Sequence, residues 1–211
     1  MREWVDWPTD EEFTALHFAV YHGNWELIQI LAEQLGADVE KCNIYGANVL
    51  HIAAQGDQPA PLYYFSKIRG LDIDSVDKRG STPLHWASYS KSEFALCYIL
   101  AMGPNLEIQD SSGLTPLHLA IKSVGDLRST RPVRSLLLKG SSRRAVNNQG
   151  QGVFDIIKDD VQGQLRRDLE SILKEPRYFE FAMCRPPVAP LRQNHKTQVF
   201  FMSLVGISLA V

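Results

Sequence analysis

Cysteine is scarce in this chain of 211 residues: Cys42, Cys97 and Cys184 lie far apart, and no two of them form a C-x-x-C pair. The sequence therefore predicts neither a disulfide framework nor a structural zinc site. The first eight residues are acidic and lack an apolar run, so they do not have the pattern of a signal peptide. These absences are typical of a protein in a reducing, cytosolic environment.

Motifs of catalysis are also missing. The chain has no Gly-rich phosphate-binding loop, no H-E-x-x-H pair and no Gly-x-Ser-x-Gly turn. We therefore expect no catalytic residue, no cofactor and no metal site in these 211 residues. The sequence predicts a protein that binds a partner and does not convert a substrate.

One short pattern recurs four times along the chain. Its clearest copies are residues 77–85, Asp-Lys-Arg-Gly-Ser-Thr-Pro-Leu-His, and residues 110–118, Asp-Ser-Ser-Gly-Leu-Thr-Pro-Leu-His. Residues 14–19 and 49–54 repeat the Leu-His part with changes at the Thr-Pro pair. A repeat of about this length predicts a helical array. The histidines of the four copies follow one another at intervals of 34, 34 and 33 residues: His17, His51, His85 and His118.

Each repeat has the composition of two helices. Thr82-Pro83 and Thr115-Pro116 suit a helix start, with Thr as the cap and Pro at the first helical position. A second apolar run follows each histidine. Neither helix could bury its apolar face alone, so neighbouring repeats must stack around a shared core.

The four histidines could suggest a ladder of metal ligands. Each lies on a different repeat, however, and packed helices are about 10 Å apart, whereas the ligands of one metal lie ~2 Å from it. We expect the histidines to hydrogen-bond backbone groups and so connect one turn to the next.

The two clearest copies follow the Asp-x-x-Gly-x-Thr-Pro-Leu-His pattern at every defined position, and the chain resembles the ankyrin-repeat family over residues 14–174. The resemblance implies an all-α solenoid of about five helix pairs. We expect an N-terminal cap at 1–13, repeats at 14–43, 44–76, 77–109, 110–147 and 148–174, a proline-containing basic linker at 175–196, and the start of a transmembrane helix at 197–211.

Two repeats depart from the pattern. The fourth carries about five extra residues between its helices, which we expect in an exposed loop within residues 125–132. In the fifth, Asp155 stands where the histidine would be. Terminal repeats need a polar outer face, and residues 1–13, with Trp4, Trp7 and Phe13, are expected to cover the opposite end of the array, with partner binding as the alternative.

Charge is distributed unevenly. Residues 1–122 carry 8 basic and 16 acidic side chains, whereas residues 123–211 carry 14 basic and 8 acidic ones. A basic end can bind nucleic acid or an anionic membrane. The uncharged segment 197–211 favours the membrane, and we expect no nucleic acid partner.

As a helix, segment 197–211 would measure roughly 22 Å, whereas the hydrocarbon layer of a membrane is about 30 Å thick, so we expect the helix to continue beyond Val211. The alternative is a soluble helix docked on the repeats.

Partner binding is expected on the first helices, which line a concave groove in ankyrin-like arrays. Trp86 and Tyr89 occupy first-helix positions of the third repeat, where small or aliphatic residues are more usual. Aromatic residues are preferred anchors at interfaces. We therefore take both as candidates for binding a protein or an extended peptide, with core packing as the competing explanation for Trp86.

An ankyrin array, a short basic linker and a membrane helix are together similar to the front of the ankyrin-repeat Asp-His-His-Cys palmitoyltransferases. That resemblance implies recruitment of substrate proteins by the repeats, partly through the tryptophan of a Thr-Pro-Leu-His-Trp motif, which is Trp86 here. It also implies a membrane location with the repeats on the cytosolic side. The chain contains no Asp-His-His-Cys sequence, so catalysis cannot reside in it. The alternatives are a cytoplasmic ankyrin adaptor without enzymatic role and the front of an ankyrin-bearing ion channel.

Overall fold

The computed structural model of the chain describes residues 3–174, which form helices joined by loops, without a β-strand. A short 3-10 helix, η1 (Glu3–Asp6), precedes five helix pairs, so the predicted all-α ankyrin-type array is confirmed for these residues. The first helices are α1 (Ala15–Tyr21), α3 (Val49–Gln55), α5 (Pro83–Tyr89), α7 (Pro116–Leu127) and α9 (Val153–Asp160). The second helices are α2 (Trp25–Gln29) continued by η2 (Ile30–Gln34), α4 (Pro59–Tyr63) continued by η3 (Tyr64–Ile68), α6 (Glu93–Ala101), α8 (Arg131–Leu138) and α10 (Gly163–Lys174).

Two predicted segments, the linker at 175–196 and the apolar segment at 197–211, lie outside the described residues. Within residues 3–174, every helix is too short or too polar to cross a bilayer.

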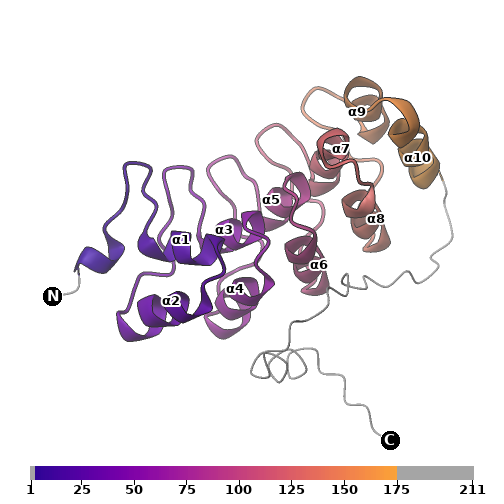
Figure 1. Cartoon of the computed structure of the whole chain (residues 1–211). Helices are drawn as coiled ribbons and strands as arrows, with labels where there is room; N and C mark the ends of the chain where they lie inside the picture. The colour runs from indigo at the N-terminus through magenta and orange to yellow at the C-terminus, as the bar shows by residue number, and fades with distance from the viewer. Residues whose placement is uncertain (1–2, 175–211) are drawn as a thin grey trace, which may run out of the picture. The chain divides into compact units, whose positions relative to one another are not determined.

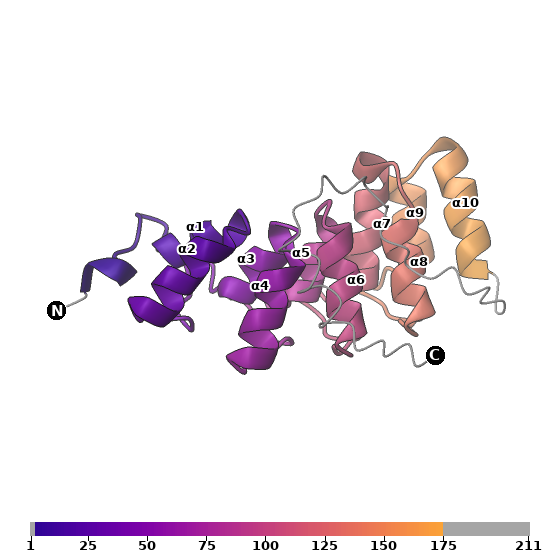
Figure 2. The same cartoon turned by 60° about the horizontal axis from the view of Figure 1, so that its bottom comes forward.

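The first helices pack on one another in chain order, from α1 through α3, α5 and α7 to α9 (Figure 1). In the second layer α4 contacts α6 and α6 contacts α8 (Figure 2). Leu50, Leu84 and Leu117 come from successive first helices and are buried. Burying one such side chain stabilises the fold by about 1.5–3 kcal/mol. A single apolar core therefore continues from repeat to repeat.

A shared cap starts the first helices. In repeat 3, Thr82 is the N-cap and Pro83 follows at the first helical position. The backbone N–H of Thr82 donates to Nδ1 of His85 at 3.0 Å. Because Nδ1 is an acceptor, the proton of the neutral ring sits on Nε2, which donates to the backbone oxygen of Leu114 in the next repeat at 3.1 Å. The corresponding residues of repeat 4 are Thr115, Pro116 and His118.

The loops between repeats form turns that project on one side of the array (Figure 1). In repeat 3 the Oδ1 atom of Asp77 accepts the backbone N–H groups of Arg79 and Ser81, at 2.8 and 2.9 Å. Neighbouring turns are joined directly, since the N–H of Ser111 donates to the backbone oxygen of Arg79 at 2.7 Å. Equivalent bonds join Lys78 to Tyr45 and Asn148 to Ser112.

The intervals from His17 to His51 and from His51 to His85 are each one residue longer than the interval from His85 to His118, and the second helices within them differ accordingly. α2 and α4 each continue into a five-residue π-helix, whereas α6 is α-helical throughout. A π turn holds more residues than an α turn, so it takes up the extra residue without displacing the following loop. This explains why the histidine intervals are 34, 34 and 33 residues.

The extra residues of repeat 4 lengthen a helix, and the expectation of a loop across residues 125–132 was wrong for most of that range. α7 has 12 residues where α5 has 7. Leu117, Ile121 and Val124 are buried at helical spacing, so the apolar stripe keeps the chain helical past the length of the other first helices. Arg128 ends it in a left-handed conformation with φ of 50°.

The ends of the array are closed in different ways. At the N-terminal end Val5 is buried, while Trp4 and Trp7 are exposed. The carboxylate of Asp6 accepts the N–H of Asp38 at 3.0 Å and fixes η1 to the first repeat. In the fifth repeat the Oδ2 atom of Asp155 accepts the N–H of Gly152 at 3.1 Å, replacing the histidine in the cap.

Candidate functional site

The side chains one and four residues after each histidine lie on one face of the first helices, because residues three apart in a helix are neighbours. Phe18, Tyr21 and Tyr89 are exposed there, Trp86 is half-buried and Ile52 is buried. The first-helix face, as we call it, consists of Phe18 and Tyr21 of α1, Ile52 and Gln55 of α3, Trp86 and Tyr89 of α5, and Leu119 and Lys122 of α7.

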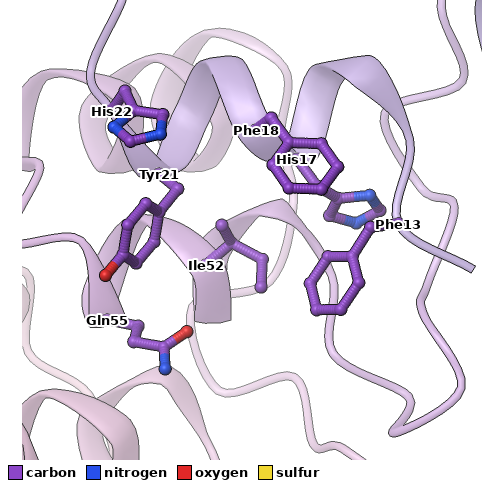
Figure 3. A pocket seen from close by; sticks show the side chains of 7 residues that line it. All are labelled: Phe13, His17, Phe18, Tyr21, His22, Ile52 and Gln55. Carbon is purple, nitrogen blue, oxygen red and sulfur yellow. The ribbon is translucent and has the colours of Figure 1, made fainter. Parts of the chain in front are cut away.

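A pocket of about 300 Å³ opens on this face between α1 and α3. Phe13 and Phe18 stand on one side of Ile52, and Tyr21 and His22 stand on the other (Figure 3). The rings of Phe13 and Phe18 are 5.8 Å apart between centroids. Such a pocket suits an apolar side chain. Its lining is completed by His17 and Gln55.

Trp86 lies in the next gap along the face and belongs partly to the core. Its indole N–H donates to Oδ2 of the buried Asp77 at 2.9 Å, and its ring meets that of His51 edge to face at 5.7 Å. The carboxylate that shapes the turn of repeat 3 therefore also holds the tryptophan. A ring fixed in this way loses little rotational freedom when a partner contacts its open side.

Tyr89 is one turn further along α5 and is 58% exposed. No ring contact or hydrogen bond of its side chain is present among the described residues. Its exposure makes it a solvent-facing aromatic neighbour of Trp86.

The four motif histidines are buried below this face and act on the backbone. Nε2 of His51 hydrogen-bonds the backbone oxygen of Ser81 at 3.0 Å, and His85 makes the equivalent contact to Leu114. The Nε2 atoms of His17 and His118 lie near the backbone oxygens of Lys41 and Ala145 without reaching hydrogen-bond geometry.

Burial keeps these histidines neutral. It lowers the pKa of His17 and of His51 to about 4, and it lowers the pKa of His85 and of His118 in the same direction. Each ring bonds its own cap and faces the next turn, so the four do not converge. Among residues 3–174, no three His, Cys, Asp or Glu side chains are grouped so that they could hold a metal ion.

Sequence reasoning singled out Trp86 and Tyr89, and it placed Phe13 in the N-terminal cap, but it missed Phe18 and Tyr21. Their position relative to the motif histidine could have identified them. Phe18 and Tyr21 stand one and four residues after His17, as Trp86 and Tyr89 stand after His85. Transferring the third repeat's positions to the first would have found them.

The chain is similar in sequence to two palmitoyltransferases and to inversin. The chain is 31% identical over 118 residues to the probable palmitoyltransferase AKR2 of Saccharomyces uvarum, an alignment covering 54% of this chain and 16% of that protein. It is 28% identical over 177 residues to the palmitoyltransferase AKR1 of Naumovozyma castellii, covering 82% and 22%. It is 27% identical over 133 residues to the inversin of Canis lupus familiaris, covering 59% and 12%. The chain thus matches less than a quarter of each relative's length.

Two family models also match. One, described as ankyrin repeats in three copies, matches residues 50–149, and the other, described as ankyrin repeats in many copies, matches residues 16–65. Together they extend over more than half of the chain. The matched residues contain the first four stacked helix pairs and joined turns between them. The chain belongs to the ankyrin-repeat family, whose repeats bind protein partners.

Proposed function

We propose that this chain recruits a protein partner by binding an extended peptide on the first-helix face, with Trp86 and Tyr89 as anchors. The observation that supports this most is the pair's geometry. Asp77 fixes one edge of the Trp86 ring, and Tyr89 next to it is exposed. Pre-ordered aromatic side chains are the residues that contribute most at interfaces.

We also propose that these repeats are the cytosolic front of a membrane-bound protein S-palmitoyltransferase. The similarity to yeast palmitoyltransferases supports it. The repeats would hold a substrate protein, while the transfer itself would take place elsewhere, since the Asp-His-His-Cys sequence is absent from these residues. A cytoplasmic adaptor without enzymatic role is the alternative, since the chain is also similar to inversin, whose name indicates no transferase.

Replacing Tyr89 tests the anchor with little disturbance to the fold. We expect Tyr89→Ala to weaken peptide binding by about tenfold or more, because truncating an interface hot spot costs about 2 kcal/mol. Its unfolding free energy should change by no more than about 0.5 kcal/mol, because the side chain is exposed. Isothermal titration with a peptide selected from a random library would give the affinity, and urea unfolding the stability.

Phe94→Ala is the matched control, because Phe94 is an exposed aromatic residue on α6, the second helix of the same repeat. It should leave peptide affinity unchanged. Trp86→Ala should weaken both binding and stability, since the ring is also packed on His51. Equal affinities of wild type and Tyr89→Ala, or an equal loss in Phe94→Ala, would reject the anchor.

A second expected result concerns the membrane. If residues 197–211 begin a spanning helix, the protein expressed from its full reading frame should stay with membranes through alkaline carbonate extraction. Arg185, Arg192 and Lys196 precede the segment, and basic flanks favour the cytosolic side. Protease added to intact, cytosol-side-out vesicles should therefore digest the repeats. Release by carbonate would favour the cytoplasmic adaptor, and protected repeats would reverse the orientation.

A further inference from the structure

The pocket between α1 and α3 adjoins the most acidic part of the array. Residues 3–40 contain nine acidic side chains and no Lys or Arg. Three of the acidic residues, Asp10, Glu11 and Glu12, are exposed on the loop that leads directly into Phe13, a wall of the pocket. None of the three forms an ion pair within residues 3–174.

This loop is held in place by its own hydrogen bonds. The N–H of Thr9 donates to the backbone oxygen of Phe13 at 2.9 Å, and the N–H of Phe13 donates to Oγ1 of Thr9 at 3.1 Å. The N–H of Ile44 in the next turn donates to the backbone oxygen of Glu11 at 3.1 Å. The backbone that carries these three carboxylates is therefore fixed directly before Phe13, a wall of the pocket.

We propose that this pocket is a second subsite of the peptide groove and takes an apolar side chain that is flanked by Lys or Arg. The apolar side chain would fill the space among Phe13, Phe18 and Tyr21, and the flanking cations would face residues 10–12. Charge complementarity selects this partner, because an acidic peptide would meet like charge at residues 10–12. The inference rests on the proposed function, of which it defines the ligand chemistry.

The spacing of the helices predicts how many residues separate the two anchors of a bound peptide. The pocket lies between α1 and α3, and Trp86 lies in the next gap, between α3 and α5, where its ring meets that of His51. Neighbouring helices are about 10 Å apart, and an extended chain advances about 3.3 Å per residue. The two apolar anchors of one bound peptide should therefore be about three residues apart, with the basic residues next to the anchor that enters the pocket.

Selection from a random peptide library against the 211-residue chain tests the predicted pattern. We expect enriched peptides to carry an apolar residue beside Lys or Arg, and a second apolar residue about three positions away. Titration of one enriched peptide should show about tenfold weaker binding to Phe18→Ala and several-fold weaker binding to the Glu11→Gln/Glu12→Gln double variant. Raising the salt concentration should reduce the difference between the double variant and wild type, because exposed charges are screened.

Two controls separate the subsite from general effects. Glu40→Gln removes an exposed carboxylate that lies neither on the loop at residues 9–13 nor in the pocket lining, and it should bind as wild type does. Phe94→Ala removes an exposed ring from α6 and should also bind normally. Enriched peptides without basic residues, or unchanged affinity of Phe18→Ala while Tyr89→Ala is weakened, would overturn the subsite and leave the proposed function standing. Failure to enrich any peptide, or unchanged affinity in both variants, would overturn both.

Discussion

Lowering the pH from 7 to 5 is expected to destabilise the array by several kcal/mol. Burial holds the pKa of His17 and of His51 at about 4, against 6.5 in the unfolded chain. Between these values the unfolded state binds more protons than the folded state, so stability is fully present above pH 6.5 and is lost as the pH falls toward 4. The linkage amounts to about 2 kcal/mol for each of the two histidines by pH 5. Burial of His85 and His118 acts in the same direction.

Urea unfolding at pH 7 and pH 5 measures this effect, and a variant assigns it. His51→Gln removes one titrating group, so its stability should fall by about 2 kcal/mol less than that of wild type over the same pH range. If His51→Gln and wild type lose the same free energy between pH 7 and pH 5, buried His51 is not the source.

Gly113→Ala is expected to destabilise the array by about 3 kcal/mol or more. Gly113 lies in the turn before α7 with φ of +75°, where an L-residue costs about 1–2 kcal/mol. A Cβ atom there would also lie 2.6 Å from the backbone nitrogen of Asn148 in the next turn. That nitrogen donates to the backbone oxygen of Ser112, so the contact can be relieved only by separating two repeats. Shifts of this kind in packed structure cost about 1–3 kcal/mol more.

Gly36→Ala separates the two causes. Gly36 has nearly the same backbone conformation, with φ of +73°, but a Cβ atom there would meet nothing within 4 Å. The variant should lose only the conformational part, about 1 kcal/mol. Thermal or urea unfolding of the two variants beside wild type gives the comparison. Equal losses of stability in the two variants would mean that the turn of Asn148 accommodates the added Cβ at no cost.

The sequence predicted the array because the repeats share most of their requirements at corresponding positions. Gly80, Thr82, Pro83 and His85 specify a turn, a cap and a helix start, and these elements formed wherever the pattern recurred. The π-helices were not predictable from propensity, since one added residue changes neither apolar spacing nor composition appreciably. The longer α7 was predictable in principle, because Ile121 and Val124 continue its apolar stripe.

The sequence predicted only part of the candidate site. Trp86 and Tyr89 stood out because their residue types are unusual for their positions. The hydrogen bond from Trp86 to Asp77 could not be predicted. One carboxylate oxygen of Asp77 already accepts a backbone N–H in its own turn, and only the folded repeat brings the indole N–H of Trp86 to the other oxygen. Phe18 and Tyr21 form a pocket only with Phe13 and Ile52, which lie on a separate loop and a separate helix.

The most direct test of the account is amide hydrogen exchange of the chain with and without a library-selected peptide. If the peptide lies on the first-helix face, exchange should slow in α1, α3 and α5 and in the loop at residues 9–13. The second helices α4, α6 and α8 should exchange at their original rates, because they form the other layer (Figure 2). Slower exchange confined to the second helices would contradict peptide binding on the first-helix face.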